Sequence, residues 1–161
     1  MIIEYDSKYD EDIKDLLLEL QKHIVSIDKE GYNIITDSYR EEYFKKTMNE
    51  VSKYEGKILL YEEENKVQGL IVSLIENDEM EEYSFKAPKR GRISELVVSK
   101  NVRNKGIGSK LLNCMTDYLK SVGCKSILIG VFAYNDNAVK FYQKNGYHLR
   151  MHDMISVIDK K

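Results

Sequence analysis

Residues 95–110 read Glu-Leu-Val-Val-Ser-Lys-Asn-Val-Arg-Asn-Lys-Gly-Ile-Gly-Ser-Lys, and they give the clearest indication of how this chain folds. An apolar strand is followed by a short basic connection, and Gly106 and Gly108 then open an amphipathic helix. The first N–H groups of a helix have no partner within it and its dipole is positive there, which suits phosphate. Glycine lets a ligand approach the backbone without meeting a Cβ atom, and Arg103, Lys105 and Lys110 add positive charge. We therefore predict that this segment binds a pyrophosphate.

Three phosphate-binding motifs can be compared with this segment. The P-loop, G-x-x-x-x-G-K-[ST], fails because Ser109 and Lys110 follow Gly108. The dinucleotide fingerprint, G-x-G-x-x-G, fails because its third small residue would fall at Leu111 and because it belongs early in a βαβ unit. The pattern [QR]-x-x-G-x-[GA] is satisfied in full from Arg103 to Gly108.

A second motif follows at a matching distance. After the helix comes an apolar strand at 126–132, and residues 135–147 then have the pattern N-x-x-A-x-x-F-Y-x-x-x-G-Y. With these two motifs, residues 92–147 closely resemble the GNAT superfamily of N-acetyltransferases. Over residues 1–91 only the order of helix, helix and hairpin agrees with that family.

Hydrophobic periodicity predicts the elements along the whole chain. We expect strands at 2–6, 57–64, 67–74, 92–98, 126–132 and 147–158, and helices at 10–25, from 37 or 38 to 54, 106–122 and from 135 or 136 to about 145. The acidic stretch 76–82 is expected to be a solvated loop. This order indicates a mixed α/β fold. The resemblance implies its GNAT form, a mostly antiparallel sheet with helices on both faces, in which the parallel central strands 92–98 and 126–132 splay apart.

Length and composition bound the class of protein. A chain of 161 residues without an evident linker or repeat is expected to be a single domain over 1–161. A net charge of −2 does not suit a nucleic-acid partner. No apolar run approaches the roughly 20 residues of a membrane helix, and no signal peptide is evident. We therefore expect a cytoplasmic protein with neither nucleic-acid nor membrane partners.

Two further residue types limit the chemistry. Cys114 and Cys124 are too few for a disulfide framework, and we expect both to be buried free thiols. His148 and His152 share one side of the last predicted strand, but no other ligands lie at a suitable spacing, so we expect no metal.

The resemblance implies acetyl-CoA as the co-substrate. Its pantetheine arm would enter the gap between the splayed strands and pair with the backbone of Leu96, Val97 and Val98, as an added strand does. A backbone N–H near Val97 would stabilise the oxyanion formed during acyl transfer. The residues implied to hold the cofactor through the pyrophosphate loop are Arg103, Asn104, Lys105, Gly106, Ile107, Gly108 and Ser109.

Three side chains are candidates for chemistry. Glu95 is the candidate general base, and the equally weighted alternative is a strand residue that binds the substrate cation or faces solvent. Tyr142 stands at the family's tyrosine position and is the candidate acid for the leaving thiolate, its alternative being packing beside Phe141. Asn135 is expected to bind pantetheine or to cap a helix.

The predicted reaction is direct acetyl transfer from acetyl-CoA to a primary amine. Tyr32, Tyr39 and Tyr43 fall where family members often wall the acceptor site, so aromatic rings there would suit a small cationic amine. The alternatives are a protein or peptide N-acetyltransferase, an enzyme acting on charged tRNA, and a non-catalytic acyl-CoA-binding sensor. Dimers are common in the family, so a homodimer is compatible with the resemblance.

Overall fold

The chain was analysed as a computed structural model, which describes residues 1–77 and 88–158. It forms two compact units, Met1–Gly130 and Val131–Lys161. The single domain over 1–161 stays a prediction. Residues 78–82 of the predicted acidic loop lie outside the described residues.

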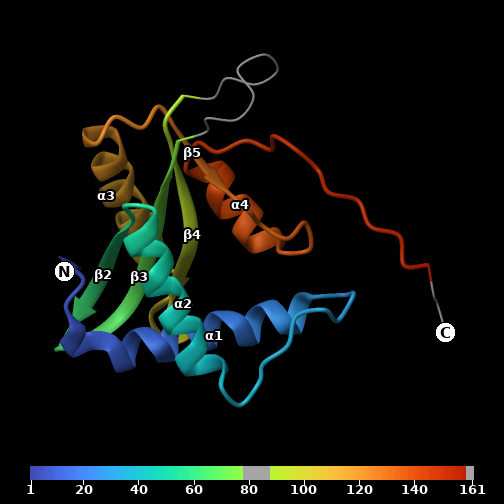
Figure 1. Cartoon of the computed structure of the whole chain (residues 1–161), viewed down its shortest axis with the longest axis horizontal. Coiled ribbons are helices and arrows are strands. Elements are labelled where there is room, and N and C mark those ends of the chain that lie inside the picture. The colour runs from blue at the N-terminus through green and yellow to red at the C-terminus, as the bar shows by residue number, and fades with distance from the viewer. Residues whose placement is uncertain (78–87, 159–161) are drawn as a thin grey trace. The chain divides into compact units, whose positions relative to one another are not determined.

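A five-stranded sheet in the order β1-β2-β3-β4-β5 forms the centre of the first unit (Figure 1). Its strands are β1 Ile2–Glu4, β2 Lys57–Glu63, β3 Lys66–Glu76, β4 Arg90–Val98 and β5 Ser126–Ile129. The first four strands pair in antiparallel order, and β4 pairs with β5 in parallel. The structure confirms the predicted mixed, mostly antiparallel sheet with one parallel pair. In the described residues β5 is the last strand of the order, so this pair lies at the edge of the sheet and not, as predicted, at its centre.

Helices cover both faces of this sheet. The helices α1, Asp10–Ile27, and α2, Tyr39–Lys53, lie on one face, and α3, Ile107–Ser121, lies on the other (Figure 1). Short 3₁₀ helices precede α1 at Ser7–Tyr9 (η1) and follow β4 at Lys100–Val102 (η2). The buried core between α1 and the sheet is made by Ile13, Leu16, Leu17, Ile58, Leu60, Val67, Leu70, Val72 and Val97. On the other face, α3 buries Ile107, Leu111, Leu112, Met115 and Leu119.

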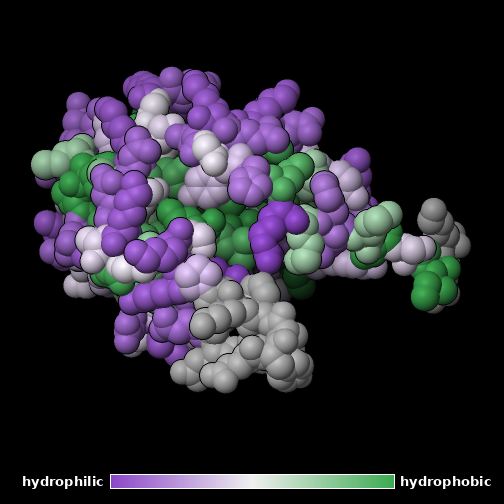
Figure 2. Space-filling model, turned by 90° about the horizontal axis from the view of Figure 1, so that it is seen from above, coloured by the Kyte–Doolittle hydropathy of each residue, from purple (hydrophilic) through white to green (hydrophobic). Residues whose placement is uncertain are grey.

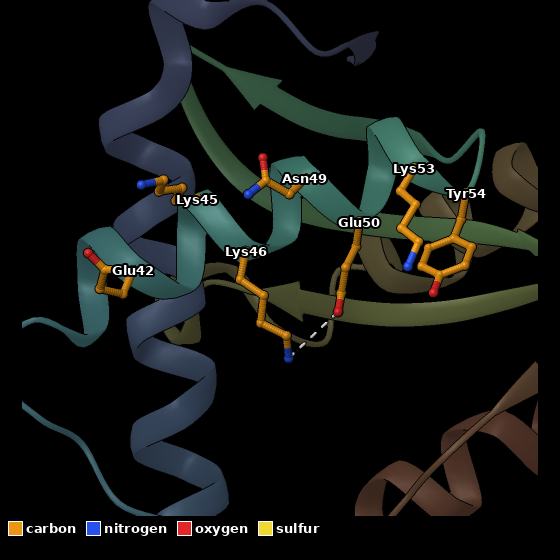
Figure 3. Close-up of a pocket in the computed structure, with 7 residues that line it drawn as sticks. All are labelled: Glu42, Lys45, Lys46, Asn49, Glu50, Lys53 and Tyr54. Carbon is orange, nitrogen blue, oxygen red and sulfur yellow. Dashed lines mark ion pairs between the residues drawn. The ribbon is translucent and has the colours of Figure 1, made fainter.

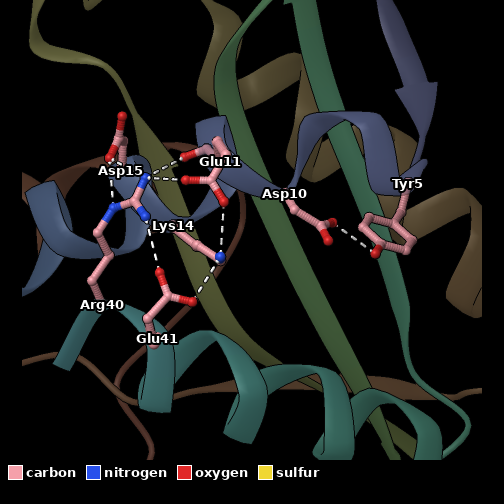
Figure 4. A network of polar contacts seen from close by, with 7 residues as sticks. All are labelled: Tyr5, Asp10, Glu11, Lys14, Asp15, Arg40 and Glu41. Atoms are coloured by element: carbon pink, nitrogen blue, oxygen red, sulfur yellow. Dashed lines mark hydrogen bonds and ion pairs between the residues drawn. The ribbon is translucent and has the colours of Figure 1, made fainter. Parts of the chain in front are cut away.

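A network of charged side chains joins α1 to α2 (Figure 4). Arg40 of α2 forms ion pairs with Glu11 and Asp15 of α1 at 2.9 and 2.8 Å, and Lys14 of α1 pairs with Glu41 of α2 at 2.7 Å. Single exposed ion pairs contribute little free energy, but several together fix an orientation. The network therefore links the start of α2 to the first two turns of α1.

The second unit contains α4, Asp136–Lys144, followed by a chain with no regular structure from Tyr147 to Ile158. The strand predicted at 147–158 is therefore wrong. The segment is rich in apolar residues, several of them at alternate positions, but none of residues 148–158 is buried, and Met151 and Met154 are 72% and 96% exposed. An isolated extended segment does not count as a strand without a backbone partner. Figure 2 shows the apolar side chains exposed on the surface of this segment.

Two smaller differences concern β5 and a cysteine. The strand predicted at 126–132 ends at Ile129, so β5 is three residues shorter than expected. Cys124 is buried, but the prediction for Cys114 is wrong, because Cys114 is exposed. It lies on α3 outside the stripe of buried residues that faces the sheet. In the described residues, none of the helices has the length and apolar character that crossing a membrane requires.

Candidate active site

Strands β4 and β5 are paired over only part of their length. The ladder joins residues 90–93 of β4 to residues 126–129 of β5 and ends there. The other side of β4 stays paired to β3 as far as Val98. Residues 94–98 therefore have an edge that β5 does not cover, and backbone groups on this edge can accept an added strand. This uncovered edge includes Leu96, Val97 and Val98, and it arises because β5 ends at Ile129. The splaying of the two strands that the resemblance implies stays a prediction.

A β-bulge lies where the two strands separate. Val72 of β3 pairs with Glu95, and Ser73 pairs with Ile93, so Ser94 has no opposite residue in β3. A bulge of one residue reverses which face the following side chains point to. The contacts agree with this reversal.

Residues on the two sides of the bulge contact different helices. Before the bulge, a Cβ atom on Gly91 would lie 2.5 Å from Leu119 of α3. After it, Val97 belongs to the core under α1, and Glu95 contacts α2. If side chains alternated regularly from residue 91 to residue 95, Glu95 would share the α3 face with Gly91. The bulge therefore delivers the Glu95 carboxyl group to the face covered by α1 and α2.

Glu95 is 8% exposed, which excludes the alternative of a strand residue facing solvent. The hydroxyl group of Tyr43, from α2, donates a hydrogen bond of 2.6 Å to Glu95 Oε1. Burial raises the pKa of Glu95 to about 7, while the Tyr43 hydrogen bond and the charge of Lys46 act in the opposite direction. A carboxyl group with a pKa near neutrality is suited to accept and release protons.

The α2 side of the site is aromatic and charged. The rings of Tyr39 and Tyr43 stack with centroids 4.9 Å apart and planes 13° from parallel. Lys46 Nζ lies 5.2 Å from the Tyr43 ring centroid and 3.8 Å from Glu50 Oε1. Along α2 lies a depression of about 340 Å³ (Figure 3). Its lining is formed by Glu42, Lys45, Lys46, Asn49, Glu50, Lys53 and Tyr54.

The predicted pyrophosphate loop leads from η2 into α3. Gly106 has φ +76°, in the left-handed region, and a Cβ atom built there would meet no other atom within 4 Å. The α3 helix has neither a side-chain cap at its N-terminus nor an acidic residue in its first turn. The first backbone N–H groups of α3 are therefore not capped by a side chain, and this helix start is suited to bind an anionic ligand.

Arg103 anchors this loop. Its Nε donates to the backbone oxygen of Val98 at 2.9 Å, and its Nη2 contacts Glu19 Oε1 of α1 at 3.1 Å. The backbone N–H of Lys100 donates to the same Glu19 oxygen at 2.8 Å. Arg103 is thus already engaged in shaping the loop, whereas Lys105 is exposed beside Gly106.

Some predicted cofactor residues offer only their backbone. The side chain of Ile107 is 3% exposed and packs on the sheet beside Gly69, and that of Val97 is also 3% exposed. Asn104 is exposed with φ +64°, while Gly108 and Ser109 are partly exposed in the first turn of α3. Backbone N–H groups are the donors that a helix start supplies to phosphate, so buried side chains there do not conflict with the predicted role.

The second unit holds the two remaining predicted residues. Asn135 caps α4, because its Oδ1 accepts a hydrogen bond of 3.2 Å from the Ala138 N–H. The Tyr142 ring lies edge-on to Phe141 and to Tyr147, with centroid distances of 5.1 and 5.6 Å. The capping and packing alternatives named for these residues are thus both present. A role toward pantetheine for Asn135 and toward the thiolate for Tyr142 stays a prediction.

Comparison with known proteins identifies the family. The acetyltransferase (GNAT) family matches residues 27–147, which is most of the chain. The chain therefore belongs to the GNAT acetyltransferase family, as its two motifs predict.

Individual relatives are distant. Glucosamine 6-phosphate N-acetyltransferase from Arabidopsis thaliana is 25% identical over 116 residues, 72% of this chain and 76% of that protein. Its crystal structure has a TM-score of 0.66 at 24% identity and covers 99% of this chain and 98% of that one. The BH1408 protein from Bacillus halodurans, solved as a tetramutant, has a TM-score of 0.85 at 19% identity, over 98% of this chain and 99% of that one.

AAC(6')-Iy, solved with the bisubstrate analogue CoA-S-monomethyl-acetylneamine, has a TM-score of 0.73 at 11% identity, over 99% of this chain and 98% of that one. At such identities, the similarity of these structures shows a shared fold.

Proposed function

We propose that this protein transfers the acetyl group of acetyl-CoA to a primary amine by direct attack. The proposal rests on one observation: the uncovered edge of β4 and the buried carboxyl group of Glu95 belong to the same five residues, 94–98. The first feature suits an extended pantetheine arm, and the second suits removal of a proton from the amine.

The residues of the loop and α3 fit the pyrophosphate of acetyl-CoA. The uncapped start of α3 would donate backbone N–H groups from residues 107–109, and Gly106 leaves room for close approach. Lys105 and Lys110, both exposed, would add positive charge. The backbone of Leu96 to Val98 would pair with the pantetheine.

Glu95 accounts for the first proton transfer. An alkylammonium group cannot attack a carbonyl until it loses a proton, and Glu95 in its ionised form accepts that proton directly or through water. The amine nitrogen then forms a bond to the acetyl carbon, and the C–S bond breaks. We assign the proton that the leaving thiolate needs to Tyr142, from its position in the second family motif.

We propose a small cationic amine as the acceptor. The stacked pair Tyr39 and Tyr43 offers aromatic surface for a cation beside Glu95. The Arabidopsis relative is named for a small amine, glucosamine 6-phosphate. Amino sugar phosphates, polyamines and amino acids are therefore the amines to test first.

The deciding experiment is calorimetric titration with acetyl-CoA of the wild type, Gly108→Trp and the matched control Asn113→Trp. Gly108 lies in the first turn of α3, and Asn113 is exposed further along the same helix. We expect saturable binding by the wild type and the control, and loss of at least 10-fold in affinity for Gly108→Trp. A folded wild type that does not bind acetyl-CoA would refute the proposal.

Turnover separates an enzyme from a binding module. Release of CoA thiol is followed with each amine, for the wild type, Glu95→Gln and Tyr142→Phe. For an enzyme we expect amine-dependent release and a fall in kcat of about 100-fold or more for Glu95→Gln, since a general base typically contributes 10²–10⁴-fold. Binding without amine-dependent release for any amine in the panel would favour the sensor alternative.

A further inference from the structure

The Glu95 carboxylate is held from one side only. Its Oε1 accepts the 2.6 Å hydrogen bond from Tyr43, and no other hydrogen bond to either oxygen is found in the described part of the chain. The residue opposite Glu95 on β3 is Val72, which is apolar and belongs to the core. Tyr43 is therefore the polar group that decides where this carboxylate points.

We propose that Tyr43 is a positioning residue for Glu95: its hydroxyl group occupies Oε1 and leaves Oε2 to take the proton from the attacking amine. This inference rests on the proposed function of Glu95 as the base. A carboxylate on a strand has free torsions at its end, and one short hydrogen bond fixes which oxygen faces the substrate.

The fold holds Tyr43 in place from several directions. Its ring stacks on Tyr39, one turn earlier in α2, and its backbone oxygen accepts from Thr47 Oγ1 at 2.9 Å. The Arg40 and Lys14 network fixes α2 against α1 one turn away. The hydroxyl group thus meets Glu95 as part of a rigid element, as positioning requires.

The groups that act electrostatically on Glu95 all come from α2: Tyr43, Lys46 and Glu50. Tyr39 does not shift the pKa of Glu95, although burial and the charge of Glu95 raise the pKa of Tyr39. Burial raises the pKa of Glu95, and the Tyr43 hydrogen bond and Lys46 hold it lower than burial alone would. Burial and the neighbouring carboxylate raise the pKa of Tyr43 far above its ordinary value. Tyr43 therefore stays protonated, and a donor, over the whole range in which Glu95 titrates.

The test is the pH dependence of kcat in Tyr43→Phe. Removal of the hydroxyl group leaves the ring and its stacking intact but destabilises the ionised carboxylate. We expect the acid limb of the profile to move to higher pH by about one unit or more, because hydrogen bonds to charged groups contribute more than neutral ones. The KM for acetyl-CoA is expected to change less than twofold. The matched control, Tyr39→Phe, removes a hydroxyl group from the same stack and is expected to leave the limb in place.

A second substitution moves the limb in the opposite direction. Replacing Tyr43 by 3,5-difluorotyrosine keeps the shape of the ring and makes the hydroxyl group a stronger donor. We expect the acid limb to move to lower pH. A purely structural role for Tyr43 would not produce opposite shifts from these two replacements, so equal or absent shifts overturn the inference.

Two further measurements separate this inference from the function on which it rests. Glu95→Gln is expected to abolish the acid limb, and a limb that survives would refute Glu95 as the base. The carboxyl carbon of Glu95 is also titrated by ¹³C NMR, which needs no turnover. A titration midpoint that is the same in the wild type and Tyr43→Phe overturns the role of Tyr43, whatever the assay shows.

Discussion

Glu95 is the buried polar group whose charge the fold must accommodate. Val72 lies opposite it, and Val97 follows it on the same face, so the carboxyl group sits among apolar side chains with Tyr43 as its hydrogen-bond partner. Removing a charge from water is costly, and the carboxyl group responds by holding its proton up to a higher pH.

The effect on stability has a definite sign. Burial raises the pKa of Glu95 from 4.5 to about 7, so between these pH values the folded state keeps a proton that the unfolded state has released. The free energy of unfolding therefore falls as pH rises through this window. We expect Glu95→Gln, which still accepts from Tyr43, to be more stable than the wild type at pH 8 by about 3 kcal/mol.

Urea unfolding at pH 4.5 and pH 8 measures this difference. At the lower pH the gap should shrink, because Glu95 is then protonated in the folded state. The exposed Glu63→Gln is the control, and we expect no pH-dependent gain from it. Equal stability of wild type and Glu95→Gln at pH 8 would contradict the prediction. Confirmation would mean that the site is maintained at the expense of stability.

The sequence predicts Glu95 as a candidate base but does not predict its partner. From the sequence, Tyr43 is identified only as one of three tyrosines expected to wall the acceptor site. Its contact with Glu95 joins residues 52 positions apart and depends on the packing of α2. Such a pairing follows from tertiary structure, which periodicity within one helix does not contain.

At the scale of elements, the bulge at Ser94 determines which face of the sheet the Glu95 side chain lies on. Alternation along β4 would place Glu95 with Gly91, against α3. The polar pair Ser94-Glu95 inside an apolar strand is the one sequence signal of an irregularity, but it does not tell which face each residue takes. The predicted strand 92–98 is therefore confirmed as an element. Its bulge is not predicted from the sequence and is shown by the pairing of β4 with β3.

Deletion of Ser94 tests the role of the bulge. With the extra residue removed, Ile93 and Glu95 become neighbours in a regular ladder opposite Ser73 and Val72, so both side chains keep their faces. The deletion removes only the local bend and twist that a bulge gives to a strand. We expect the variant to fold and to lose less than about 3 kcal/mol in the free energy of unfolding, within the range of most single changes.

The matched control for this deletion is Ser94→Ala. It keeps the residue count and is expected to change stability by less than about 1 kcal/mol, because Ser94 is only partly buried. Chemical denaturation of both variants gives the comparison. A deletion variant that does not fold would contradict this expectation and would show that the bend produced by the bulge is itself required.

At the scale of the whole molecule, the elements between residues 1 and 130 follow from the sequence much better than the last segment. Buried periodic patterns, such as Leu111 to Leu119 in α3, identify their elements because burial enforces the pattern. Residues 147–158 have a strand-like pattern with no backbone partner, so the same rule fails there. Pattern alone does not reveal whether a partner strand exists.

Because residues 149–158 are exposed and form no strand, we can predict the effect of removing the C-terminal segment. A chain ending at His148 loses residues 149–161, and those of them that the structure describes, 149–158, are all exposed. We expect its free energy of unfolding to lie within about 0.5 kcal/mol of the full chain, as for other changes away from buried features. Urea unfolding at several protein concentrations is the measurement. A large, concentration-dependent loss would mean that these apolar side chains are buried between molecules.

Strand β4 also fixes the distance between two parts of the proposed site. The edge proposed to hold the thioester and the side chain proposed to accept the proton lie on adjacent residues, about 3.3 Å apart along the chain. Covalent bonds set this spacing. Movements of α1 can therefore widen or narrow access for an amine without altering the spacing between these two backbone positions. Movements of α2 differ, because α2 carries Tyr43 and with it the orientation of the Glu95 carboxylate. Access and proton transfer are thus governed by different helices, while the distance along β4 is constant.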